Sequence, residues 1–202
     1  MQITLDSIQI ELRINKTKKE GMMNIQEILH GKKVDVQKMI EFYDQLDGVD
    51  CSFIYGRWKG FEVVTGHPMN GLLELASWYG KLFIDQETVY PLVILNAKKT
   101  ALFFLDPKWL PLNIDFSLLK NNSKYLAGAL KLLKTKDSKA RLRMTEFRGT
   151  ISATMIYDEK PIHDVFRKID ENTVLGWMDL KQQAQPYFFI LQRDNQSSLG
   201  FE

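Results

Sequence analysis

Apolar residues follow two different periods along this chain, and the change of period separates predicted helices from predicted strands. Val36, Met39, Ile40 and Tyr43 recur at a spacing of about 3.6 residues, which predicts an amphipathic helix. Asp35 stands where a side chain caps the first turn, so we expect this helix to begin there. Capping and breaking residues predict further helices at residues 71–79 and 123–134.

From residue 140 onward the period changes to two, as expected for strands that bury one face. Strands are predicted at residues 140–148, 150–158, 161–169, 174–179 and 187–193, and earlier at 8–14, 81–84, 88–95 and 100–105. Short antiparallel strands joined in series by tight turns form a meander, which closes into a barrel or packs as a sandwich. We therefore predict a mainly β fold with added helices (α+β), an antiparallel lipocalin-like (calycin-type) β-barrel.

Composition restricts the class of protein. The chain has 202 residues, of which 45% are hydrophobic and 26% charged, as in folded globular proteins. Cys51 is the only cysteine, which excludes an intrachain disulfide and a thiolate metal cluster, and it favours a reducing cytoplasm. No apolar run reaches the roughly 20 residues of a spanning helix. The net charge of +2 gives no reason to expect nucleic acid.

The strand at residues 140–148 carries the charges that this pattern singles out. If Leu142 and Met144 point inward, alternation places Glu146 and Arg148 inside as well. Buried charges need partners, because an unpaired one is very costly. Either the two side chains pair with each other at the barrel mouth, or they hold the polar end of an apolar ligand.

Two histidines are candidates for acid–base chemistry. His67 follows Gly66 in a turn before a predicted helix, and His163 lies on a predicted strand, where it could also ligate heme. A histidine on a strand more often has a purely structural role, and for His67 both roles stay open. No histidine–carboxylate spacing typical of a metal site occurs, and the common hydrolase, kinase and dinucleotide motifs are absent. We expect no metal and no cofactor, with heme kept as a special case of an apolar ligand.

A basic stretch offers a different reading. Residues 120–148 contain nine lysines and arginines against two acidic residues, which suits either an anionic-lipid or nucleic-acid surface or an ordinary solvated face. Aromatic residues for base stacking are sparse there, so the solvated face is favoured.

Several sequence blocks resemble a known family. Residues 56–60 read Gly-Arg-Trp-Lys-Gly, 65–68 read Thr-Gly-His-Pro and 78–81 read Trp-Tyr-Gly-Lys. With the blocks at 140–149, 152–158, 161–167 and 174–179, they resemble the GXWXG protein family, in which a GXWXG segment precedes a C-terminal domain of unknown function. The tryptophan entering the first strand is also similar to that of lipocalin-like barrels and nitrobindin. That likeness implies that Trp58 packs across the barrel base, and that the barrel binds a fatty acid, retinoid, bilin or heme.

These observations predict one domain over residues 23–202 after an extension at 1–22, with the GXWXG segment at about 43–105 and the C-terminal meander at about 139–194. We expect a binding protein for a small hydrophobic ligand, such as a lipid, fatty acid or porphyrin. An enzyme of the same fold that uses His67 or His163 on an acyl or hydrophobic substrate is the alternative, and a homodimer stays open. The expected ligand contacts are Arg57, Trp58, Glu146, Arg148, Tyr157, Trp177 and Tyr187.

Overall fold

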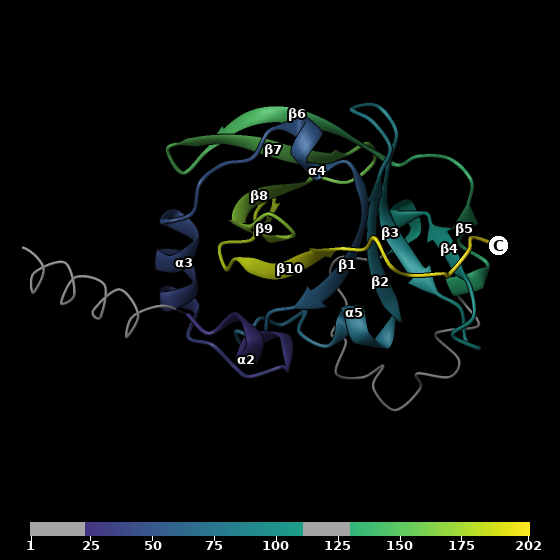
Figure 1. The fold of residues 1–202 in the computed structure, drawn as a ribbon, viewed down its shortest axis with the longest axis horizontal. Coiled ribbons are helices and arrows are strands. Elements are labelled where there is room, and N and C mark those ends of the chain that lie inside the picture. Colours follow the sequence, from purple (N-terminus) through teal and green to yellow (C-terminus); the bar gives the residue numbers. More distant parts are fainter. Residues whose placement is uncertain (1–22, 111–129) are drawn as a thin grey trace, which may run out of the picture.

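The computed structural model describes residues 23–110 and 130–202 of the chain, and these form a β-barrel with short appended helices (Figure 1). The helices are α2 (Ile25–Leu29), α3 (Val36–Asp44), α4 (Cys51–Ile54), α5 (Leu72–Leu75) and the 3-10 turn η1 (Pro107–Trp109). The strands are β1 (Gly56–Glu62), β2 (Trp78–Phe83), β3 (Val89–Leu95), β4 (Leu102–Leu105), β5 (Lys134–Thr135), β6 (Ala140–Phe147), β7 (Thr150–Tyr157), β8 (Ile162–Asp170), β9 (Thr173–Leu180) and β10 (Tyr187–Arg193).

Eight of these strands close into an antiparallel barrel. The order β2-β1-β10-β9-β8-β7-β6-β3 is closed by the pairing of β2 with β3, so barrel neighbours follow the chain except where β4 and β5 are inserted. Those two strands extend the sheet from β3 on one side of the barrel (Figure 1). The predicted antiparallel barrel with few helices is therefore confirmed.

At two strand pairings of the barrel, β3 with β6 and β7 with β8, neighbouring loop segments add hydrogen bonds to those between the strands. The pairing of β3 with β6 consists of Val89 opposite Ala140, and the backbone N–H of Leu142 donates to Gln86 in the β2–β3 turn at 2.7 Å. Between β7 and β8, the segment 47–49 takes the place of ladder contacts, because Ala153 N–H donates to the carbonyl of residue 49 and Gly48 bridges to β8. Backbone contacts from loop segments thus complete the closure.

Strand alternation divides the apolar residues between the barrel interior and its outer face. The interior core is built from the inward positions of the barrel strands together with α4. A second core lies outside, where α3 covers β9 and β10: Tyr43 is fully buried against Trp177 and Phe188. The Tyr43 hydroxyl donates to the Val165 carbonyl at 3.2 Å, which ties α3 to the barrel wall. Figure 1 shows α3 lying against the side of the barrel opposite β4 and β5.

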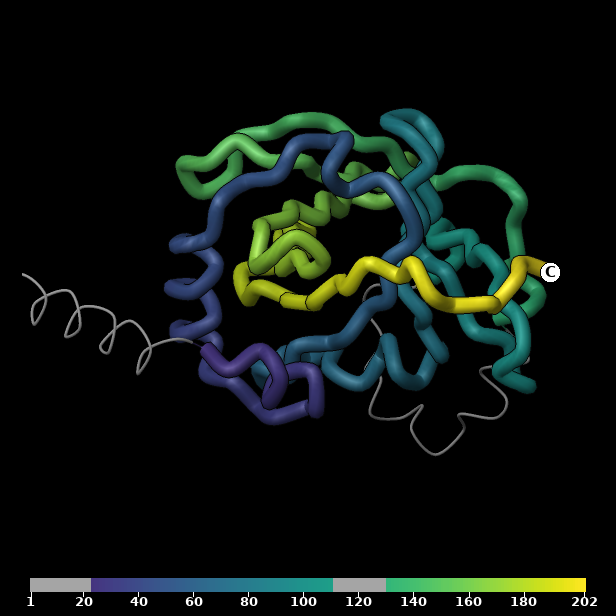
Figure 2. The backbone as a smooth tube through the Cα atoms, in the orientation of Figure 1, coloured from purple at the N-terminus to yellow at the C-terminus, as the bar shows by residue number. Residues whose placement is uncertain are grey.

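The two ends of the barrel differ. At one end α4 contributes Cys51 and Ile54 to the interior core beside Trp58, and this end is closed. At the other end lie the loop with α5 and the loop between β9 and β10, and Met69 and Leu73 of the former pack onto the interior. Beyond β10 the chain runs along the outside until Phe201 bridges to Leu102 on β4 (Figure 2).

The predicted strands of the C-terminal meander are found within two residues of their expected bounds, and Asp35 caps α3 as expected by accepting from the Lys38 N–H. The predicted helix at 71–79 is wrong in its second half: α5 ends at Leu75, and Ser77 has φ of 53°, which breaks the helix before β2 begins. The strand predicted at 8–14 lies outside the described residues, as does most of the helix at 123–134.

Candidate functional site

Charged and polar side chains meet inside the barrel, near the end that carries α5. Asp164 lies on β8 between Ile162 and Phe166, which share its inward face in the apolar core. Lys81 comes from β2, opposite Trp58 of β1, and it is also buried. Buried charges are rare in proteins unless they are paired, so this pair marks the interior as chemically distinct from an ordinary core.

Lys81 and Asp164 form a buried ion pair. The Lys81 ammonium lies 2.8 Å from Asp164 Oδ2, with both side chains at most 3% exposed. Burial lowers the pKa of Lys81 and raises the pKa of Asp164, and the opposite charge of the partner reduces both shifts without cancelling them. The ammonium also donates to the Pro91 carbonyl at 3.2 Å and contacts the Tyr157 hydroxyl at 3.5 Å, so each of its three hydrogens has a partner.

Aromatic rings surround the ammonium. Its nitrogen lies 5.0 Å from the ring centre of Phe189, 5.6 Å from that of Trp78 and 5.7 Å from that of Tyr157. Cations are attracted to the faces of aromatic rings, so these contacts add to the stabilisation by Asp164. The result is an apolar, aromatic wall with one ion pair in it.

A second carboxylate lies on the same inward face of β1 as Trp58. Glu62 accepts a short hydrogen bond from the Tyr187 hydroxyl and a second one at 2.6 Å from the backbone N–H of Gly71. Burial raises the pKa of Tyr187 well above its usual value, as does the charge of Glu62. Tyr187 therefore stays protonated at neutral pH and connects Glu62 to the interior.

His67 connects the two loops that cover this end. Its Nδ1 accepts the backbone N–H of Met69 at 3.0 Å, its Nε2 lies 2.8 Å from the side-chain amide of Gln183, and its ring packs edge-on against Tyr187. Burial lowers the pKa of His67, so the neutral form is favoured. Asn70 stabilises the same turn by accepting three backbone N–H groups, those of residues 65, 66 and 67.

Two buried polar atoms of this cluster have no hydrogen-bond partner within the described residues. They are Oδ1 of Asp164, an acceptor, and Nε1 of Trp78, a donor. Buried polar groups are nearly always satisfied, and leaving one unpaired costs about 1–3 kcal/mol. Because Lys81 contacts both residues, the two atoms belong to one region of the interior.

The residues of the GXWXG segment have structural contacts. Trp58 is fully buried at the closed end, where its Nε1 donates to the Ile54 carbonyl at 2.6 Å and Arg193 stacks on its ring at 4.2 Å. Arg57 points away from the interior: it pairs with Asp194 at 2.7 Å and donates to two carbonyls of the C-terminal segment. The position of Trp58 is that of a barrel floor, whereas Arg57 holds the C-terminal segment in place.

The expected inward orientation of Glu146 and Arg148 is wrong. Glu146 is exposed, and Arg148 lies beyond the end of β6 in the turn to β7, with φ of 52°. Arg148 then leaves the alternating pattern and pairs with Asp44 of α3 at 2.6 Å on the outside of the barrel. The two side chains thus neither pair with each other nor reach the interior.

The other predicted residues divide between the two faces of the barrel. Tyr157 and Tyr187 are interior members of the cluster, and His67 adjoins it. Trp177 lies on the outer face under α3, with Arg148 stacked on it, and His163 is exposed on the outer face of β8. The structure therefore brings three of the predicted residues together, keeps Trp58 in the same interior core at the closed end, and places the rest outside the barrel interior.

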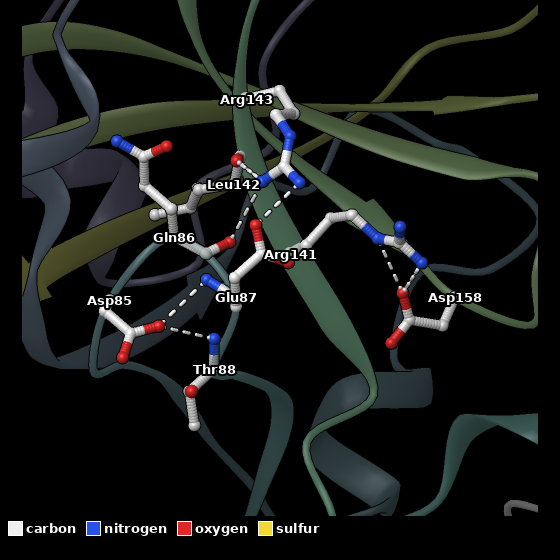
Figure 3. Close-up of polar contacts among 8 residues, drawn as sticks. All are labelled: Asp85, Gln86, Glu87, Thr88, Arg141, Leu142, Arg143 and Asp158. Carbon is white, nitrogen blue, oxygen red and sulfur yellow. Dashed lines mark hydrogen bonds and ion pairs between the residues drawn. The ribbon is translucent and has the colours of Figure 1, made fainter.

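In the described part of the basic stretch, carboxylates pair with four of the seven lysines and arginines. Figure 3 shows Arg141 paired with Asp158, and Arg143 paired with Glu87 while also donating to the Gln86 carbonyl. In the same view Asp85 accepts the N–H groups of residues 87 and 88, which shapes the β2–β3 turn at the seam to β6. Lys139 likewise pairs with Asp106 at 3.1 Å. These pairs favour the solvated-face reading, while residues 120–129 lie outside the described part.

Three charged members of the cluster were not predicted as site residues, namely Glu62, Lys81 and Asp164, and neither was Trp78. A signal existed for Asp164, a carboxylate on the apolar face of a strand, and for Glu62, which alternates inward with Trp58. Lys81 could not be placed in this way, because bulges on either side of Gly80 shift the register between β2 and β3.

Among residues 23–110 and 130–202, no group of three or more histidine, cysteine or acidic side chains is arranged to hold a metal ion. In the same part of the chain, none of the helices has the length and apolar character needed to cross a bilayer.

Comparisons with known proteins agree with the predicted family. The model described as "GXWXG protein" matches residues 41–99, and that of a domain of unknown function (DUF4334) matches residues 138–193. A crystal structure of a protein from Thermomonospora curvata is similar over 92% of this chain and 98% of its own, with 30% sequence identity and a TM-score of 0.62. A search of curated proteins finds no match.

Proposed function

Because this chain belongs to the GXWXG proteins, with the domain of unknown function following the GXWXG segment, we propose that its barrel binds a small, largely apolar ligand in the interior. Neither family description names an activity, so the proposal rests on the site itself. The ligand lies with its polar end at Lys81 and Asp164 and its apolar body against the aromatic wall.

The observation that carries this proposal is the unpaired oxygen of Asp164. A carboxylate that is 1% exposed in an apolar core would normally have both oxygens hydrogen-bonded, yet Oδ1 has no partner among the described residues. Binding sites commonly combine apolar walls with a few convergent polar groups. An unsatisfied acceptor and an unsatisfied donor beside three aromatic rings fit that description better than they fit a purely structural core.

The ligand reaches the interior from the end with α5. Trp58, α4 and Arg193 occupy the opposite end, where burying the Trp58 side chain contributes about 3–5 kcal/mol to stability. The α5 end is covered instead by loop residues such as Leu73, and its two loops meet at His67, which contacts Gln183. Opening the loops at His67 uncovers the cluster without breaking a strand ladder.

A neutral fluorescent probe, N-phenyl-1-naphthylamine, tests the proposal. We expect a saturable rise in its emission with one site per chain, and competition by medium-chain alkyl compounds. Ala140→Leu adds three carbons inside the barrel opposite Tyr157, and we expect it to weaken probe binding at least about tenfold, since these carbons compete with the probe for space in the interior.

His163→Leu on the outer face of β8 is the matched control, and it should leave probe binding unchanged. Circular dichroism and urea unfolding show whether each variant is folded. If folded wild-type protein takes up no probe, and if denaturing mass spectrometry finds no small molecule extracted from it, the proposal fails.

The histidines do not favour the enzyme alternative. Both ring nitrogens of His67 are used by Met69 and Gln183, and His163 faces away from the interior. Neither has an unengaged nitrogen directed at the cluster, which a general base or a heme ligand requires. The binding proposal therefore stands without a catalytic step and without heme.

A further inference from the structure

We infer that the polar end of the ligand is a neutral group that both donates and accepts hydrogen bonds, such as an alcohol, and not a carboxylate. This inference rests on the proposed function and names the class of ligand. It departs from the fatty acid that a general likeness to ligand-binding barrels would suggest.

The cluster requires a donor from the ligand. Asp164 accepts from Lys81 through Oδ2, and Oδ1 is left without a partner among the described residues. A ligand hydroxyl or amide N–H satisfies this atom, whereas an ionised carboxylate has acceptors only. A carboxylate would also place two like charges close together in a region of low dielectric constant.

The same cluster requires an acceptor from the ligand. Trp78 Nε1 is buried and has no partner among the described residues, and the indole N–H is a donor only. Its ring lies 5.6 Å from the Lys81 nitrogen, on the side of the cluster where Phe189 also packs. A hydroxyl oxygen accepts from such an N–H and at the same time offers its own hydrogen, so one small group meets both needs.

Lys81 does not provide a free positive charge for an anion. Its three ammonium hydrogens are directed at Asp164, the Pro91 carbonyl and the Tyr157 hydroxyl. The cluster also contains Glu62, which accepts from Tyr187, so it holds two carboxylates and one lysine, and this local charge is unfavourable to an anionic ligand. An incoming carboxylate would have to displace Asp164 from Lys81.

Competition against N-phenyl-1-naphthylamine at pH 8 tests this with ligands of one chain length: 1-decanol, decanamide, decanoate and decane. We expect decanol to compete at least about tenfold more tightly than decanoate, the difference made by leaving one buried polar group unpaired. Decanamide, which also donates and accepts, distinguishes a general neutral site from one that is specific for alcohols.

Asp164→Asn should reverse the preference. It removes the negative charge and leaves Lys81 without its carboxylate, so decanoate should gain about tenfold or more while decanol loses affinity. Trp78→Phe keeps a ring but removes the N–H, and we expect it to weaken decanol and decanamide several-fold while the binding of decane is unchanged. His163→Gln, exposed on the same strand as Asp164, is the control and should alter none of these affinities.

The outcomes separate the two proposals. If decanoate competes more tightly than decanol in the wild type, or if folded Asp164→Asn keeps the wild-type order, the inference is overturned while binding in the barrel stands. If none of the four compounds competes and the probe itself does not bind, the proposed function fails first. Should Asp164→Asn not fold, the Trp78→Phe comparison decides alone, and unchanged decanol affinity there overturns the inference.

Discussion

Replacing Lys81 by methionine is the most informative test of the interior as described. The change keeps an unbranched side chain of similar length and removes the ammonium that pairs with Asp164 at 2.8 Å. Asp164 is then left 1% exposed among apolar residues with neither oxygen paired to a cation. Removing one partner of a buried ion pair costs about 3–5 kcal/mol, because the other charge stays buried and uncompensated.

That cost is large against the stability of an ordinary domain, which is about 5–15 kcal/mol. The double variant Lys81→Met with Asp164→Leu removes both charges, and replacing a buried pair by apolar residues is often neutral or stabilising. We therefore expect most of the lost stability to return in the double variant. Lys139→Met, which breaks the more exposed pair with Asp106, is the control and should cost only about 0–1 kcal/mol.

The pH dependence gives an independent check. Burial raises the pKa of Asp164 above its ordinary value of 3.8, so the folded state binds its proton more tightly than the unfolded state does. Stability from such a group is fully present below pH 3.8 and is lost as pH rises through the raised pKa. In Lys81→Met nothing offsets this loss, so its deficit relative to wild type should be largest at neutral pH and shrink as pH falls toward 4.

Urea unfolding followed by circular dichroism, at pH values between 4 and 8, measures these differences. A deficit below about 1 kcal/mol at pH 7 that does not change with pH would refute the reasoning, because it would mean that Asp164 finds water or another partner without Lys81. A double variant no more stable than the single one would contradict it as well.

Three further changes have expected outcomes. Gly60→Ala should cost about 1–3 kcal/mol in urea unfolding, because its Cβ would lie 2.1 Å from ring atoms of Trp78. His67→Asn keeps an acceptor for the backbone N–H, so it should remove the loss of stability that wild type shows as pH falls below 6.5, since burial lowers the pKa of His67. Arg148→Ala should cost at most about 1 kcal/mol by loss of the pair with Asp44, and thermal unfolding in 1 M NaCl should show a smaller difference than in low salt.

The sequence predicted the barrel well because its strands alternate cleanly. In β8, Ile162 and Phe166 face the core while His163 faces solvent, as the period of two requires. The predicted site was less accurate at places where the backbone departs from that period. Arg148 lies in a tight turn with φ of 52°, so extending the β6 alternation by one residue placed it on the wrong side.

Lys81 shows the same limit of prediction from strand alternation, because it faces the interior although the sequence did not predict it. The register between β2 and β3 shifts between Trp78 and Gly80 and again between Gly80 and Leu82, so the side chain that faces the core cannot be read from the letters around it. Partners such as Tyr157 lie 76 positions away in the chain, and only the closure of the barrel brings them together. A buried pair therefore depends on how distant strands come together in the fold. The apolar face of a strand, by contrast, can be predicted from the residues next to it in the sequence.

The GXWXG segment runs from the closed end of the barrel toward the polar cluster. This position explains why it contains both a large aromatic residue and a glycine. Trp58 fills the closed end through its bond to Ile54 and the stacking of Arg193. Two positions along the same inward face, Gly60 leaves space for the Trp78 ring, because any Cβ there would overlap it. The ring of Trp78 in turn lies 5.6 Å from the Lys81 nitrogen, and its N–H has no partner among the described residues. A substitution at Gly60 should therefore change ligand recognition as well as stability, and Gly60→Ala should weaken decanol competition even under conditions where the variant is fully folded.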